Sequence, residues 1–176
     1  MSLLSSILAF ALFALTPATG QMLPWSFSAL PSDSLPADEV SSLYQDSDGF
    51  IWIITYNSLV RFDGYETKSN SVSGAGDNHV DRYLHTAIED DEGHILIGTE
   101  RGLLSLDKRS EVLTGITDAA VDNMNVNKFV KDSSGRIWVC GNKGLFFRDK
   151  GKSSFSRLDL RTDFQSSGLT DLIDIC

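Results

Sequence analysis

The sequence predicts an all-β chain that forms an incomplete β-propeller, with three four-stranded blades and the first strand of a fourth. Two observations predict this fold. A segment recurs three times without a gap, and its copies are residues 40–63, 84–107 and 126–149. One glycine of the segment, at positions 49, 93 and 135, recurs after 44 and then 42 residues. That period is typical of four-stranded propeller blades.

Each copy begins with a first strand and a tight turn. The first strands are expected over residues 40–45, 84–89 and 126–131, and each ends before an aspartate. The turn sequences that follow are residues 46–49, 90–93 and 132–135. Their aspartate can accept hydrogen bonds from nearby backbone amides, and their glycine can take a positive φ. The sequence therefore predicts a hairpin into the second strand.

The second strands are nearly continuous in apolar residues. They are expected over residues 50–54, 94–98 and 136–140. A run without polar alternation indicates a strand that is covered on both faces, as in a blade packed between two neighbours. Trp52 and Trp138 share one repeat position, with Leu96 between them, and we interpret both indoles as core residues rather than as platforms for sugar rings.

Third and fourth strands complete each repeat. Short polar links lead into third strands at residues 59–62, 103–106 and 145–148. More polar fourth strands are expected at residues 65–68, 111–113 and 154–158, as suits the outer edge of a sheet. The predicted organisation is blade repeats at 40–83, 84–125 and 126–168, and the truncated start of a fourth at 169–176.

The N-terminus predicts export. Residues 3–15 form an apolar stretch that is shorter than the roughly 20 residues of a membrane-spanning helix. Small residues at Ala18 and Gly20 suit signal peptidase, so residues 1–20 are predicted to be a signal peptide. An uncleaved anchor and a wrongly assigned start codon are the alternatives. Residues 21–39 form a lead-in segment.

Charge and cysteine content exclude several classes of protein. The formal net charge of −9 repels nucleic acid and anionic lipid, so no nucleic-acid partner is expected. Cys140 and Cys176 are the only cysteines, which excludes a disulfide framework. The two could pair in an oxidising compartment, but the apolar run around Cys140 favours a small buried side chain without a redox role.

No catalytic, cofactor-binding or metal-binding residue is predicted. The turn at Asp46 to Gly49 does not have the spacing of an EF-hand loop. His79, His85 and His94 are too irregularly spaced for a zinc pair, and we expect them in solvated loops. Sequences of the GxSxG, GxxxxGK and HExxH types do not occur.

Four loop residues are the candidate ligand contacts. Blade-end loops can vary between repeats while the strands stay constant, and loops often carry binding residues. The candidates are Tyr56, Asn57, Arg101 and Lys143.

The three copies resemble the two-component regulator propeller repeat, and residues 45–64, QDSDGFIWIITYNSLVRFDG, match its pattern best. Leu96 departs from it, because the family has a Trp there. The resemblance implies a periplasmic sensor region of many blades, which is joined through a further β-domain and a membrane helix to a histidine kinase. Other members of the family end in a diguanylate cyclase.

The expected function is therefore ligand sensing outside the cytoplasm, as a fragment of a longer sensor histidine kinase. The chain itself is expected to be no enzyme and to need no cofactor. The resemblance implies an oligosaccharide ligand, a homodimeric parent and attachment to the inner membrane through a downstream segment only. The alternatives are the sensor region of a diguanylate cyclase, a secreted propeller hydrolase or lyase, and a protein-interaction scaffold, because propellers host all of these functions.

Overall fold

The computed structural model describes four stretches of the chain: residue 30 and residues 35–36, 39–71 and 83–159. The predicted signal peptide, most of the lead-in segment and the predicted start of a fourth repeat lie outside them. Contacts divide the chain into two units, Met1–Leu30 and Pro31–Cys176. All described strands belong to the second unit.

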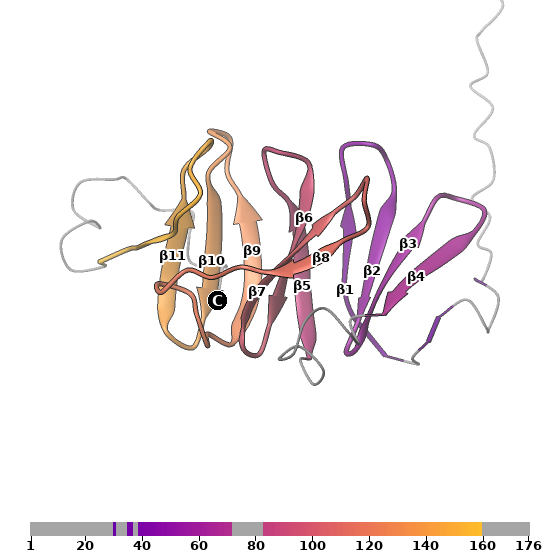
Figure 1. The fold of residues 1–176 in the computed structure, drawn as a ribbon, viewed down its shortest axis with the longest axis horizontal. Helices are drawn as coiled ribbons and strands as arrows, with labels where there is room; N and C mark the ends of the chain where they lie inside the picture. The colour runs from indigo at the N-terminus through magenta and orange to yellow at the C-terminus, as the bar shows by residue number, and fades with distance from the viewer. Residues whose placement is uncertain (1–29, 31–34, 37–38, 72–82, 160–176) are drawn as a thin grey trace, which may run out of the picture. The chain divides into compact units, whose positions relative to one another are not determined.

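The described strands form three four-stranded antiparallel sheets, each in sequence order (Figure 1). The first sheet contains β1 (Val40–Gln45), β2 (Ile51–Thr55), β3 (Ser58–Phe62) and β4 (Thr67–Ser71). The second contains β5 (Leu84–Glu89), β6 (His94–Thr99), β7 (Gly102–Asp107) and β8 (Leu113–Gly115). The third contains β9 (Val126–Lys131), β10 (Ile137–Gly141), β11 (Gly144–Arg148) and β12 (Ser156–Arg157). The predicted all-β fold class and its three four-stranded blades are confirmed.

The hairpin turns form as predicted, through the aspartate that opens each one. Oδ1 of Asp46 accepts hydrogen bonds from the backbone N–H groups of Asp48 at 3.0 Å and Phe50 at 2.9 Å. Asp90 and Asp132 accept the equivalent bonds. Gly49 has a φ of 90°, which an L side chain rarely adopts. The first strands consequently end where the sequence predicts.

The fourth strands begin later than predicted. Oδ1 of Asp63 accepts hydrogen bonds from the N–H groups of Tyr65 and Glu66, which holds these residues in a turn. Oδ1 of Asp107 bonds to the amides of Arg109 and Ser110 in the same way. The sequence analysis assigns residues 65–66 and 111–112 to strands. In the structure they precede β4 and β8 and lie outside them.

Two of the three hydrophobic clusters of the described residues combine residues of adjacent sheets, and the middle sheet contributes to both of these. Ile95 and Ile97 of β6 pack in a cluster with residues of the first sheet, including Trp52. Leu96, between them, packs in a cluster with residues of the third sheet, including Val139. For β6, the prediction that the second strand is covered on both faces is confirmed by this alternation.

Each first strand contains an irregularity at the same repeat position. Val40 pairs with Thr55 and Ser42 with Ile54, so Ser41 stands outside the pairing. His85 and Asn127 are skipped in the same way in β5 and β9. An unpaired residue of this kind is a β-bulge, which bends the strand and redirects a side chain.

Two predictions are wrong within the described residues. His85 lies in β5 and His94 begins β6, so neither is a solvated loop residue; His79 lies outside the described residues. Cys140 is disulfide-bonded rather than a free buried thiol. Cys176, the other cysteine of the sequence, lies outside the described residues. No helix within residues 39–71 and 83–159 is long and apolar enough to cross a membrane.

Candidate functional site

A polar cleft of about 500 Å³ lies where the β1–β2 turn meets the second sheet, and we call it the turn cleft. Ser47 and Asp48 of that turn line one side. Glu89, at the end of β5, and Lys108, which follows β7, line the other. Charged side chains from two blades therefore meet at the turn end of the sheets.

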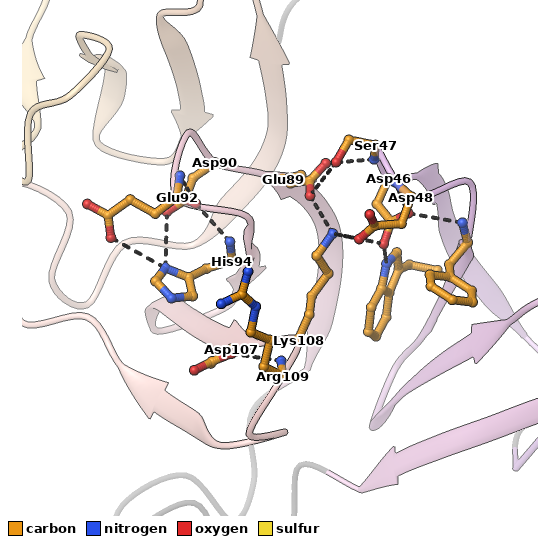
Figure 2. Close-up of polar contacts among 12 residues, drawn as sticks. Asp46, Ser47, Asp48, Glu89, Asp90, Glu92, His94, Asp107, Lys108 and Arg109 are labelled. Atoms are coloured by element: carbon orange, nitrogen blue, oxygen red, sulfur yellow. Dashed lines mark hydrogen bonds and ion pairs between the residues drawn. The ribbon is translucent and has the colours of Figure 1, made fainter.

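Lys108 is the centre of this meeting point (Figure 2). Its Nζ lies 2.5 Å from Oε1 of Glu89, 2.6 Å from Oδ2 of Asp48 and 3.4 Å from Oδ2 of Asp46. The Lys108 side chain is 14% exposed, and that of Asp46 is fully buried. A cation of the second blade is thus held between two carboxylates of the first blade and one of its own.

The pKa values of Lys108 and Glu89 indicate that both of these groups are ionised at neutral pH. Burial opposes the charge of Lys108, but hydrogen bonds to Asp48 and Glu89 outweigh it and raise the Lys108 pKa. Burial likewise raises the pKa of Glu89, but the bond from Lys108 and two bonds from Ser47 lower it below the ordinary value. A protonated Lys108 has no lone pair for base chemistry. The cluster can hold two blades together.

The hairpin aspartates receive a further donor from the strands. Nε1 of Trp52 donates to Oδ2 of Asp46 at 2.8 Å, and Nε1 of Trp138 donates to Oδ2 of Asp132 at 3.0 Å. These bonds add a polar role to the core packing that the sequence predicts for both indoles. Burial favours the neutral form of Asp132, but hydrogen bonds from Ser134 and Trp138 outweigh it and lower the pKa of its carboxyl.

The middle blade obtains its donor from its neighbour. Leu96 stands at the tryptophan position and has no N–H to offer. Instead, the guanidinium of Arg148, at the end of β11, lies 3.3 Å from Oδ2 of Asp90. The three buried or half-buried turn aspartates therefore all have a side-chain donor at Oδ2, although its source differs.

The turn cleft is also lined by two arginines, Arg61 and Arg109. Arg61 lies over the ring of Phe50, 4.7 Å from its centre. Neither Arg61 nor Arg109 forms an ion pair with a carboxylate of the described residues. His94 lies 3.6 Å from Glu92 and 3.7 Å from Asp90. No group of described side chains is suited to hold a metal ion.

The four predicted loop residues lie at the opposite ends of the second strands from the turn cleft. Tyr56 and Asn57 connect β2 to β3, Arg101 connects β6 to β7, and Lys143 connects β10 to β11. All four are exposed, and none lines the turn cleft.

Each of these loops makes its own local contacts. The ring of Tyr56 lies 5.7 Å from that of Tyr83. Nε of Arg101 lies 3.6 Å from Glu100, and Lys143 donates to the carbonyl of Asp122 at 2.6 Å. The role of these loop residues in ligand binding stays a prediction. Sequence analysis missed the Lys108 cluster, because its carboxylate partners lie up to 62 residues away along the chain.

Comparison with known proteins bears on family and fold. The model of the two component regulator propeller family matches residues 34–57. Curated protein sequences give no match. The solved structures with a similar fold include the extracellular domain of BT4673 from B. thetaiotaomicron, described as a proposed one component system, with 19% identity and a TM-score of 0.58. That alignment covers 72% of this chain and 17% of that chain.

Two further solved structures have a similar fold. One is the extracellular domain of BT4673 described as a proposed hybrid two component system, with 19% identity, a TM-score of 0.55 and the same coverage. The other is the extracellular domain of the proposed hybrid two component system BT3049 from B. thetaiotaomicron, with 21% identity and a TM-score of 0.58. That alignment covers 77% of this chain and 18% of the neighbour, so the chain spans under a fifth of these proteins. The chain thus has the fold of propeller-type extracellular domains, and its residues 34–57 carry a repeat of the two component regulator propeller family.

Proposed function

We propose that this chain is part of the ligand-sensing propeller of a two-component signal transduction protein and acts outside the cytoplasm. The observation that supports the proposal best is the family repeat at residues 34–57 on a propeller fold. Extracellular domains of proposed one component and hybrid two component systems share that fold. A propeller alone does not specify function, so the family repeat is what favours sensing over catalysis.

The proposal includes a location and a parent protein. Residues 1–20 direct export, the chain lies in the periplasm, and a segment downstream anchors a longer parent in the inner membrane. The parent is a homodimer that carries a histidine kinase module. The part played by this chain is recognition of an oligosaccharide, which requires no covalent chemistry.

Signalling requires that the oligosaccharide binds one arrangement of the dimer more tightly than another. A ligand with equal affinity for both arrangements would shift no population. The blades must transmit the difference in binding as nearly rigid units. The Lys108 cluster supports this, because it fixes the first blade to the second through buried charged groups.

A complementation experiment tests the proposal. The gene is deleted in its source organism and restored either at full length or without the codons for residues 40–159, with export of both products checked by immunoblot. Transcripts are then compared during growth on a panel of purified oligosaccharides. We expect at least one oligosaccharide to induce a set of transcripts only in the strain with the full-length gene.

Two results would contradict the proposal. Identical transcripts in all strains on every oligosaccharide would exclude a sensing role. Recovery of the full-length product with its N-terminal region in the cytoplasm would exclude the location. The partial deletion serves as the control, since it separates loss of the propeller from loss of the whole protein.

A further inference from the structure

The first strands of the three sheets line a groove of about 620 Å³, which we call the first-strand groove. Its lining residues all belong to β1, β5 and β9. β5 contacts both β1 and β9, so the three strands are neighbours. None of the predicted loop residues and none of the side chains in the Lys108 cluster lines this groove.

The bulge residue of each first strand lies in the wall of the groove. Ser41, His85 and Asn127 occupy one repeat position, and each is skipped by the strand pairing of its own sheet. All three are polar. The bulge therefore places three different hydrogen-bonding side chains at one level of the groove, on a backbone that is otherwise repeated.

These polar groups lack a hydrogen-bond partner among the residues that the structure describes. No hydrogen bond joins the side chains of Ser41 and Asn127 to a described residue. Nε2 of His85 is buried without a hydrogen-bond partner. A buried polar atom without a partner is rare in folded proteins and calls for a physical reason. A ligand in the groove that reorients the imidazole would supply the missing partner.

The rest of the groove lining consists of apolar residues, two lysines and three further hydroxyl-bearing residues, Ser42, Tyr44 and Thr86. Leu43, Ala87 and Phe129 lie two residues after the bulges, and Leu43 is 66% exposed. No aspartate or glutamate lines the groove, although the chain has a net charge of −9. Lys131, which lines it, is held by Asp91 and by the carbonyl of Glu89. A row of polar groups beside a row of apolar groups suits a ring with hydroxyl edges and a C–H face.

The same bulges oppose the addition of a peptide strand. β1, β5 and β9 are each the first strand of their sheet, and an edge strand often accepts an extra strand through its backbone. A bulge interrupts the regular spacing of backbone donors and acceptors that such a strand needs. A small ligand bound by side chains therefore fits the groove better than an extended peptide.

We propose that the first-strand groove binds a saccharide without a cationic group, and that Ser41, His85 and Asn127 determine which saccharide is bound. The proposal rests on the proposed function for the ligand class. It assigns the contacts to the first strands β1, β5 and β9, whereas the sequence analysis assigned them to Tyr56, Asn57, Arg101 and Lys143. The two assignments predict opposite effects for a matched pair of asparagine variants.

The experiment uses the full-length gene product and an array of neutral, acidic and amino-sugar oligosaccharides. Asn127→Ala is compared with Asn57→Ala, because both asparagines are exposed. Asn127 lines the first-strand groove, whereas Asn57 is one of the predicted loop contacts. We expect the wild type to bind at least one neutral or acidic oligosaccharide. Asn127→Ala should weaken that binding about tenfold, the effect of one lost hydrogen bond. Asn57→Ala should leave it within about twofold.

Other outcomes overturn the proposal. Failure to bind any oligosaccharide on the array would do so, as would weakened binding in Asn57→Ala with normal binding in Asn127→Ala. Ser41→Ala is a second groove variant, and unfolding in urea checks that all three variants remain folded.

The transcript experiment separates the two proposals. Normal induction together with unaltered binding by Asn127→Ala would overturn the groove and leave sensing intact. Binding through Asn127 without any induced transcript would overturn sensing and leave the groove intact.

Discussion

Replacing Lys108 with methionine should destabilise the junction of the first two blades. The change keeps the length and most of the apolar stem of the side chain but removes the cation that Asp46, Asp48 and Glu89 share. Breaking a buried ion pair by removing one partner typically costs about 3–5 kcal/mol. Asp48 is 60% exposed, so only the other two carboxylates carry this cost.

The expected loss lies at the lower end of that range. Glu89 keeps two bonds from Ser47, and Asp46 keeps the bond from Trp52 and those of its own turn. We therefore expect Lys108→Met to lower the free energy of unfolding by about 2–3 kcal/mol. Adding Glu89→Gln should restore part of the loss, because it removes a buried charge that has lost its counterion.

The effect should depend on pH in a defined direction. The Glu89 pKa is lowered below 4.5 in the folded protein, so its contribution is present above the unfolded pKa and is lost as the pH falls through the folded value. The Lys108 pKa is raised above 10.5, so its contribution is lost only at still higher pH. The difference in the free energy of unfolding between wild type and Lys108→Met should be largest from about pH 5 to 10 and should decrease below about pH 4.

Urea unfolding followed by tryptophan fluorescence measures these differences. Lys150→Met is the matched control, because Lys150 occupies the same repeat position in the third blade, is exposed and forms no ion pair with a described residue. It should change the stability by less than about 0.5 kcal/mol. The reasoning is refuted if both variants lose the same amount, or if Glu89→Gln worsens Lys108→Met.

Three further substitutions test individual contacts in the same unfolding assay. Trp138→Phe keeps the ring in the core but removes the 3.0 Å bond to Asp132, and should cost about 1–2 kcal/mol; an unchanged midpoint would show that this bond does not stabilise the turn. Arg148→Met leaves Asp90, which is 8% exposed, without its side-chain donor at Oδ2, and should cost about 1–3 kcal/mol, in contrast to a near-neutral change at the exposed Arg101. Gly141→Ala places a Cβ 2.0 Å from the carbonyl oxygen of Asn125 and should lower the free energy of unfolding by about 3 kcal/mol or more. Gly64→Ala meets no atom within 4 Å and should cost about 1 kcal/mol through its φ of 101°. Equal losses would contradict the steric explanation.

The sequence predicted the strands because every strand signal is local. Turn aspartates and glycines fix the ends of the hairpins within a few residues, and the apolar runs set the second strands. The first strands, such as Val40–Gln45, agree residue for residue with the prediction. The fourth strands were placed too early, because Asp63 and Asp107 cap turns that a strand pattern does not reveal.

The contacts between blades could not be predicted from the same signals. Lys108 meets Asp46 across 62 residues, and Arg148 meets Asp90 across 58. Each pair depends on how one sheet stacks on the next. The bulges at Ser41, His85 and Asn127 are equally hidden, since a skipped residue changes the pairing of a strand without changing its composition.

The three repeats share their turn aspartates but differ at the bulge residue, and this difference indicates which position can determine ligand specificity. At the turn end, each aspartate has a side-chain donor at Oδ2, and in the blade where Leu96 stands at the tryptophan position that donor is the guanidinium of Arg148. Change there is constrained, because a substitution on one blade leaves a buried carboxylate unpaired on another. At the bulge position, serine, histidine and asparagine follow one another without any described partner that must change with them. A residue that can vary while the backbone holds its position is suited to select a ligand. The variants at Asn57 and Asn127 therefore test where the ligand binds more directly than any variant of the turn cleft.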